Sequence, residues 1–423
     1  MLLLSRPAKR GLASVRRSQP RLPARGRDHG SRRAAHLAHP EHRLTIACPS
    51  PTEEDTTRDR HQARGQFLAR QERWEDLLTE IRTAETERQS TPAAMPVADL
   101  LSYGARADVV LAVEHALFDG PPAPDAPLLS GIEALEAVLA ETGHDMHLSA
   151  IVAQTHVDIA WAWRGTVPDR ELPARNRTAA TAHFDRTRDL LRPFDAPHHA
   201  LPTLALARCA LHGAGGSSLD QIADDYARLI DLDPHTPGPM RALGTRLSPR
   251  RAGSPARLEL EARRTAARTQ DVWGAGAYAW VMFDVLCSDD DTCAQLDVQF
   301  FVDGLHDILT RSPHQYTVNL LAAYCANIIG GTRTGHDAAD QTRALIADCA
   351  DWIVRTHMTE LHPLIWAHAA TGFDNTLRVR SARGFAAAGR ADALRTLAGL
   401  FRREIAQGHH IIFTDDGPLA EAV

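Results

Sequence analysis

The chain repeats a helical-hairpin rhythm from about residue 55 to residue 405, and this rhythm constrains its fold more than any other feature. Each repeat combines an amphipathic helix, a polar break carrying Pro, Gly or His, and a second helix rich in Ala and Leu. The pattern is clearest in Ile132–Trp163, Leu219–Leu247 and Leu305–Ile329. A single pair of this kind cannot bury its apolar faces alone, so successive pairs are expected to stack. The sequence therefore predicts an all-α fold, an irregular α-solenoid of antiparallel helix pairs.

The amino-acid composition also favours helices over sheets. Aromatic residues make up only 5% of the chain, and Ala and Leu supply much of the 44% apolar content. Because strands favour β-branched and aromatic residues, this composition disfavours an extensive sheet.

Several helices carry start signals. Leu219–Ile230 places its apolar residues on one stripe, and Ser218 with Gln221 is typical of a capping box. Ser130 with Glu133 predicts a second capping box.

Towards the C-terminus the pattern predicts a helix over Asp271–Leu286 and a last pair over Leu377–Ala388 and Ala391–Ala406. Ile411–Phe413 is a possible short extended segment for which the sequence offers no evident pairing partner.

Charge divides the chain unevenly. Residues 1–50 hold ten Arg and Lys9 against Asp28 and Glu41, a balance of +9, whereas the remainder holds 36 basic and 51 acidic residues, a balance of −15. We therefore expect residues 1–52 to be a disordered basic tail, residues 53–410 a helical-repeat domain and residues 411–423 a C-terminal tail. The alternatives for the basic segment are a transit peptide or an extension of the gene model. The acidic remainder argues against general nucleic-acid binding, which would depend on the basic tail.

The cysteine pattern and the hydropathy of the chain indicate the cellular compartment in which we expect the protein. None of the six cysteines forms a C-x-x-C pair, and most lie among apolar helix residues. A reducing compartment is the simplest interpretation. No apolar run reaches the roughly 18 residues of a membrane span. We expect a cytoplasmic protein with no membrane partner.

The segment His156–Gly165 places Trp161, Trp163 and Arg164 together. These side chains could form a stacking or anion-binding corner at a helix end. The structural alternative is that two tryptophans two positions apart cannot share one helix face. One would then pack in the core and the other against the next repeat, while Arg164 would bond helix-terminal carbonyls.

A second candidate is the arginine cluster of residues 241–268, which holds eight arginines and only two glutamates. On one side of a helix pair it would form a basic patch for a phosphate, an acidic partner or a lipid headgroup. Alternatively, the arginines pair with the protein's own surplus carboxylates. The residues best placed to share a face are Arg263, Arg264 and Arg268.

No pattern selects a metal site, a cofactor or catalytic residues. Among the 22 histidines, His357, His362 and His368 lie near Glu360, but their spacing is not a recognised ligand pattern. The chain lacks H-E-x-x-H, a G-x-S-x-G nucleophile elbow and a phosphate-binding loop. The sequence thus inclines towards a protein that is not an enzyme.

Several elements within residues 138–283 resemble a known group of proteins. They are Trp161-Ala162-Trp163-Arg164-Gly165, Phe184, Leu190-Leu191, Leu232-Asp233-Pro234-His235 and Leu247–Ser254. With them the chain resembles uncharacterised bacterial tetratricopeptide-like helical-repeat proteins, a domain of unknown function. The resemblance implies a helical-repeat fold without an assigned activity. The chain departs from the group at Arg251 and Ala252, where Trp and Gly are expected.

The leading hypothesis is a non-enzymatic helical-repeat scaffold that binds a protein or peptide partner on its concave face. The alternative is a small-ligand or anion-binding protein, or an enzyme, with a pocket near Trp161–Arg164 and the Arg241–Arg268 cluster.

Overall fold

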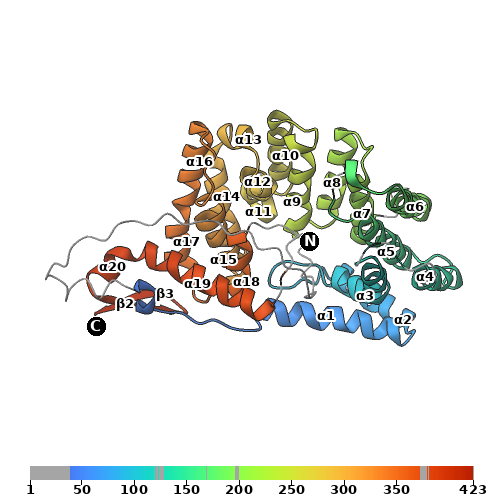
Figure 1. The fold of residues 1–423 in the computed structure, drawn as a ribbon, viewed down its shortest axis with the longest axis horizontal. Coiled ribbons are helices and arrows are strands. Elements are labelled where there is room, and N and C mark those ends of the chain that lie inside the picture. Colours follow the sequence, from blue (N-terminus) through green and yellow to red (C-terminus); the bar gives the residue numbers. More distant parts are fainter. Residues whose placement is uncertain are drawn as a thin grey trace. The chain divides into compact units, whose positions relative to one another are not determined.

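A computed structural model (Figure 1) describes residues 39–422 apart from 119, 121, 123–127, 168, 196–199, 372–378 and 380. The described chain is predominantly helical, as predicted, and it also contains one small sheet that was not predicted. It divides into two compact units: a larger unit, Pro51–Arg311, and a smaller unit made of Met1–Ser50 and Ser312–Val423. Residues 1–38 of the predicted tail lie outside the described residues.

The larger unit is built from helices that pack on near neighbours in the chain. Its helices are α1 (Glu53–Arg70), α2 (Trp74–Thr86), α3 (Val97–Leu117), α4 (Ser130–Glu141), α5 (Met146–Arg164), α6 (Ala174–Leu191), α7 (Pro202–Leu211), α8 (Leu219–Leu232), α9 (Pro237–Leu247), α10 (Pro255–Arg268), α11 (Gln270–Trp273), α12 (Gly276–Leu286), α13 (Asp290–Ala294) and α14 (Val298–Arg311). Helix α3 contacts both α1 and α5, and α5 contacts α4, α6 and α7. Further along, α8 contacts α7 and α9, while α12 contacts α9, α10 and α14.

The two predicted capping boxes have different outcomes. Ser218 accepts from the backbone N–H of Gln221, and the Gln221 side chain accepts from the Ser218 N–H, as predicted for the start of α8. The Ser130 box is absent, since α4 begins at Ser130 itself after Leu129, without a side-chain cap bond. Leu129 already has helical backbone angles. Ser130 therefore lies inside the helix and cannot act as its cap.

Helices α1 and α3 meet backbone to backbone through a pair of glycines. A Cβ atom on Gly65 would lie 2.0 Å from the carbonyl oxygen of Leu101, and one on Gly104 would lie 2.0 Å from that of Gln62. Each glycine thus leaves room for the main chain of the opposite helix.

The predicted helix Asp271–Leu286 is interrupted at Gly274, where φ is +58°. The Asp307 carboxylate accepts a hydrogen bond from the Ala275 N–H at 2.7 Å, and a Cβ on Gly274 would lie 2.1 Å from it. The left-handed backbone and the close carboxylate both require glycine here. The break separates α11 from α12.

The smaller unit combines helices with a three-stranded sheet. Its elements are a 3-10 turn (Pro40–Arg43), β1 (Leu44–Thr45), α15 (Gln315–Ala323), a π-helical turn (Tyr324–Ile329), α16 (Asp337–Ala347), α17 (Cys349–His357), α18 (Pro363–Thr371), α19 (Ala382–Leu400), α20 (Arg402–Ala406), β2 (His409–Thr414) and β3 (Gly417–Ala422). Strand β2 is central, parallel to β1 with Leu44 opposite Ile411, and antiparallel to β3 with Ile411 opposite Ala420.

This sheet divides the chain differently from the predicted domains. The described part of the expected N-terminal tail contains β1, and the expected C-terminal tail contains most of β2 and all of β3. Ile411–Phe413, for which the sequence offered no partner, is hydrogen-bonded into the middle strand. The pairing joins segments far apart in the chain, and short-range periodicity does not reveal such contacts.

The predicted final helix pair is also replaced, by the continuous helix α19 and the short α20. The prediction took Gly389 and its surroundings as a break. A Cβ on Gly389 would lie 2.1 Å from the carbonyl oxygen of Pro363, so this glycine permits close packing against α18. The start of the predicted pair, 377–378, lies outside the described residues.

Within the described chain, no helix combines the length and the apolar character needed to cross a bilayer. All six cysteines are free thiols, and four of them are buried.

The glycine contact between α1 and α3 predicts a stability effect. Gly104→Ala should lower the free energy of unfolding by about 2–3 kcal/mol, because the new Cβ has to push a backbone carbonyl aside. Gly238→Ala is the matched control, since the nearest atom to a Cβ there is 3.9 Å away. Urea denaturation followed by circular dichroism measures both. Equal stability of the two variants would contradict the contact.

Candidate functional site

The two tryptophans at the end of α5 have different surroundings. Trp163 is 5% exposed, with the Arg175 guanidinium 5.6 Å from its ring centre. Trp161 is 38% exposed and packs edge to face with Phe184 of α6. This arrangement matches the structural alternative, with one indole in the core and the other against a neighbouring helix.

Arg164 binds the backbone of the loop that follows α5. Its Nη1 donates to the carbonyl oxygen of Val167 at 2.6 Å. The guanidinium thus satisfies a main-chain acceptor in the loop that follows the helix.

Arg263 is neutralised by carboxylates of its own unit. It donates to Glu259 at 2.6 Å and to Asp297 at 2.8 Å. Its guanidinium also lies over the rings of Tyr278 and Phe300. These contacts account for Arg263 without an external ligand.

Arg264 and Arg268 are paired as well. Arg264 donates to Glu261 at 2.9 Å, and Arg268 forms an ion pair with Asp231 at 3.3 Å. The three arginines predicted to share a basic face are therefore each neutralised locally, which weakens their candidacy as an anion site.

A different arginine of the cluster reaches Trp161. Both side chains lie beside Gly213, in the turn after α7, where a Cβ would lie 2.5 Å from Trp161 Cζ2 and 2.9 Å from Arg246 Nη2. Arg246 also hydrogen-bonds Tyr226, whose pKa is raised to about 12 by burial. The predicted tryptophan and arginine segments thus meet through Arg246.

Arg246 has a second guanidinium as a neighbour. Burial and the positive charge of Arg246 lower the pKa of Arg251. Among the described residues, no carboxylate forms an ion pair with either side chain. Trp161, Arg246 and Arg251 are hereafter the arginine–tryptophan corner.

A polar stripe interrupts the otherwise apolar contact between α3 and α5. Arg106 is only 3% exposed and donates to Asp158 at 2.7 Å and to Gln154 at 3.3 Å. The Tyr103 ring lies 5.4 Å from its guanidinium. With Asp99, which lies on the same side of α3 by helical spacing, these residues form the α3–α5 polar face.

Asp99 has the most strongly shifted pKa among the residues of this face. Its side chain is half-buried, and burial raises its pKa to about 7. The carboxylates of Asp233 and Glu85 raise the pKa further, while Arg106 lowers it. Solvent reaches part of this side chain, but the surrounding protein desolvates its carboxyl group. The site holds more negative charge than Arg106 offsets.

Glu85 fixes the helices around this face. One carboxylate oxygen of Glu85 contacts Nε2 of His147 on α5 at 2.8 Å. The other accepts from the backbone N–H and hydroxyl of Thr203, at 3.0 and 3.1 Å, in the first turn of α7. A carboxylate at a helix N-terminus is stabilised by the exposed amides there. One side chain of α2 thereby joins α5 to α7.

A second polar cluster links α4, α5 and α6. His156 Nε2 lies 2.8 Å from Glu136, which also accepts two hydrogen bonds from Arg186. His156 Nδ1 lies 2.8 Å from Nδ1 of His183. Since the carboxylate can only accept, His156 Nε2 donates to it; neutral His156 then accepts from His183. Burial and the neighbouring His156 lower the pKa of His183 to about 4, so the pair is neutral at pH 7.

The α3–α5 polar face was not predicted from the sequence. A usable signal existed, because Asp99, Tyr103 and Arg106 follow one another at helical spacing within a largely apolar helix. Their partners Gln154 and Asp158 are also one turn apart. Only the packing of α3 on α5 brings the two stripes together.

Comparisons with known proteins give no relative: no family model, no curated protein and no solved structure matches the chain. Any proposal about function therefore has to come from the chemistry of these sites.

The His156–His183 pair predicts loss of stability in acid. Unfolded His183 binds a proton below about pH 6.5, whereas the folded residue does so only below about pH 4. The stability that this histidine contributes is thus complete above about pH 6.5 and is lost as the pH falls towards 4, on the order of 3 kcal/mol in total. His183→Gln should flatten the dependence of unfolding free energy on pH in this window. The exposed control His235→Gln should keep the wild-type slope, and an unchanged slope in His183→Gln would contradict the assignment.

Proposed function

We propose that this protein is a helical-repeat scaffold whose larger unit binds a protein or peptide partner, and that the partner presents cationic side chains to the α3–α5 polar face. The observation that carries the proposal is Asp99, a half-buried carboxylate with a pKa raised to about 7 beside Asp233 and Glu85. A lysine or arginine side chain placed there would offset the excess negative charge. Binding energy would come from pairing a carboxylate that the free protein leaves uncompensated.

The arrangement of helices supports a repeat scaffold. Helices α1, α3, α5 and α7 contact one another in succession, with α2, α4 and α6 as their partners. Stacked pairs of this kind form a superhelix with an inner surface made by one helix of each pair. An accessible but desolvated Asp99 on α3 fits such an inner surface.

The distance between two acidic side chains of α3 favours a peptide over a small molecule. Glu114 lies near the other end of α3, where partial burial and the Asp158 carboxylate raise its pKa. Fifteen residues separate Asp99 from Glu114, about 22 Å along a helix. An extended chain with several basic residues could contact carboxylates over this distance, whereas one small ligand could not.

A second candidate function is anion binding at the arginine–tryptophan corner. It rests on the two guanidinium groups without a carboxylate partner among the described residues, beside a part-exposed indole. An anion between Arg246 and Arg251 would relieve their repulsion, and Trp161 offers a surface for stacking.

Asp99→Asn tests the scaffold proposal because stability and binding should change in opposite directions. The folded-state pKa is raised, so the wild type loses stability as the pH rises from about 4 to about 7. At pH 8 the variant should be more stable by about 1–2 kcal/mol, less than the full conversion of the shift because solvent reaches the side chain. The same variant should bind basic peptides more weakly.

Binding is measured by selecting a random peptide library on the wild type and then by fluorescence anisotropy. We expect enrichment of Lys and Arg, and about ten-fold weaker binding to Asp99→Asn. Asp224→Asn, which removes an exposed carboxylate of α8, is the matched control. Two outcomes would overturn the proposal: selected peptides that are not enriched in Lys or Arg, or an equal loss of peptide affinity in Asp99→Asn and Asp224→Asn.

Titration with pyrophosphate tests the second candidate. Tryptophan fluorescence should change on binding, and the change should be absent in Trp161→Phe. Arg246→Gln should weaken the affinity about ten-fold or more, as expected for loss of a charge-assisted contact. Arg264→Gln removes an arginine already paired with Glu261 and should bind like the wild type. The same affinity in Arg246→Gln and the wild type would exclude the corner.

A further inference from the structure

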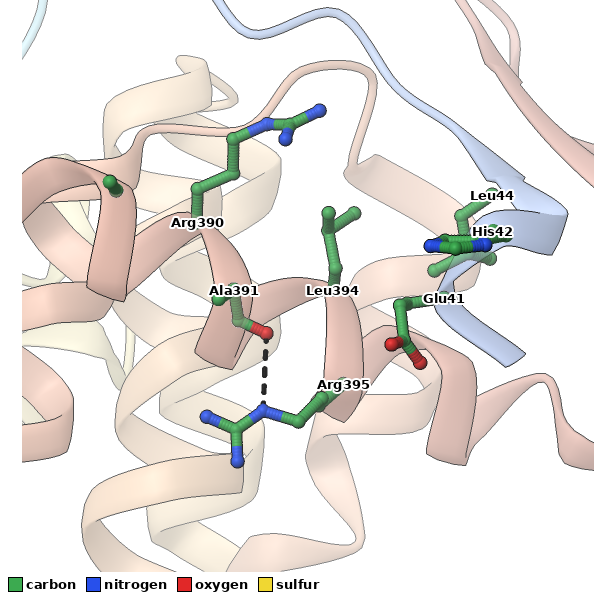
Figure 2. A pocket seen from close by; sticks show the side chains of 8 residues that line it. Glu41, His42, Leu44, Arg390, Ala391, Leu394 and Arg395 are labelled. Carbon is green, nitrogen blue, oxygen red and sulfur yellow. Dashed lines mark hydrogen bonds between the residues drawn. The ribbon is translucent and has the colours of Figure 1, made fainter. Parts of the chain in front are cut away.

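The smaller unit contains a pocket of about 620 Å³ between the N-terminal turn and α19. Figure 2 shows Glu41, His42 and Leu44 on one side of it, and Arg390, Leu394 and Arg395 of α19 on the other. Glu41 and His42 thus face α19 across a space large enough for a small molecule, and Arg390 and Arg395 of that helix line it.

Three potential metal ligands meet at the edge of this pocket. His39, Glu41 and His42 can each offer one ligand atom, and these atoms all lie within 4.8 Å of one another. His39 Nδ1 and a Glu41 carboxylate oxygen are 3.1 Å apart, and the two imidazole rings are stacked with centres 5.2 Å apart. In a 3-10 turn, side chains three positions apart lie on the same side, which brings His39 and His42 together.

The turn that carries these residues is held on both sides. Pro40 occupies its first position, and the His42 N–H donates to the carbonyl of His39 at 3.1 Å. The next residues, Leu44 and Thr45, pair with β2, and Thr45 Oγ1 lies 2.8 Å from His410 Nε2. The backbone is thus fixed before any ligand binds, which lowers the cost of ordering a site.

We propose that His39, Glu41 and His42 bind a divalent transition-metal ion of the zinc class. Two imidazoles and one carboxylate form a donor set that zinc accepts, with a fourth position left open. With bonds of about 2.0–2.1 Å to nitrogen and oxygen, neighbouring ligands of tetrahedral zinc lie about 3.3 Å apart. The 3.1 Å between His39 and Glu41 is already close to this separation. The exposed His39 and His42 side chains can rotate to bring the remaining ligand atoms to the separations of a tetrahedral site.

The open position would face an anion in the pocket. Glu41 and His42 belong both to the ligand set and to the pocket wall, and Arg390 lines the same pocket. Arg395 also lines it, but its guanidinium is paired with Asp392 of α19. A carboxylate or phosphate group could therefore bind the metal through one oxygen and an arginine through another. The ligand class of the site is a small anion bound together with the metal.

Cobalt(II) provides a direct probe, because its visible absorption reports tetrahedral coordination by nitrogen and oxygen ligands. The full-length chain is titrated with Co²⁺, and Zn²⁺ is then used to displace it. We expect one tight site per chain in the wild type and in His314→Gln, an exposed histidine of the same unit outside the cluster. Glu41→Gln and His42→Gln should each weaken binding by about 10- to 100-fold or more, the range found even for loss of an outer-sphere partner.

Thermal unfolding separates loss of the site from loss of folding. All variants should melt like the wild type without metal, and Zn²⁺ should raise the melting temperature of the wild type and His314→Gln only. Inorganic phosphate and acetate, added separately, should change the Co²⁺ spectrum of the wild type, with a weaker effect in Arg390→Gln. Equal metal affinity in the wild type, Glu41→Gln and His42→Gln would contradict metal binding by these residues. A Co²⁺ spectrum that neither anion changes would contradict anion binding to the metal.

Discussion

The larger unit depends on a continuous apolar core that runs from α1 to α7. Its buried members include Leu68, Ile81, Leu101, Ile151 and Leu204, each from a different helix. Once these faces pack together, a polar side chain on a facing surface has to find its partner on the neighbouring helix. Arg106 does so with Asp158, because a buried arginine without a carboxylate would cost several kcal/mol. Asp99 has no such direct ion pair among the described residues, and burial raises the pKa of its carboxyl group.

Much of the fold could be predicted from the sequence because apolar spacing and helix caps are local properties. The stripe of α8 and its Ser218 cap both appear as predicted. The predictions that were wrong concern positions whose structure depends on contacts with distant segments. Gly274 breaks a helix because Asp307 approaches it, and Gly389 does not break one because a neighbouring helix passes over it. Identical residues in similar sequence surroundings therefore have opposite effects, and only the packing distinguishes them.

The sites were less predictable for a related reason. Helical spacing correctly places Arg263 and Arg264 on exposed surface, but it does not show that Glu259 and Glu261 neutralise them. Helical spacing also does not show that Arg246 lies near Trp161, because the two side chains come together beside Gly213, in a turn between two other helices. His39, Glu41 and His42 were overlooked since the surrounding basic composition suggested disorder. Their order comes from the pairing of β1 with β2, in which Leu44 lies opposite Ile411, 367 residues further along the chain.

That pairing has a consequence for how the protein is made. The smaller unit takes β1 from before the larger unit and β2 from after it. Domains generally fold as units in the order in which they leave the ribosome. During synthesis, Pro51–Arg311 can therefore fold while β1 is still unpaired, because its partner strand β2 has not yet been made. Closing so long a loop is slow, and it cannot begin until the final strands appear. The sheet can thus form only after β2 and β3 have been made, and a product truncated before them would retain the helices of the larger unit but lack the sheet.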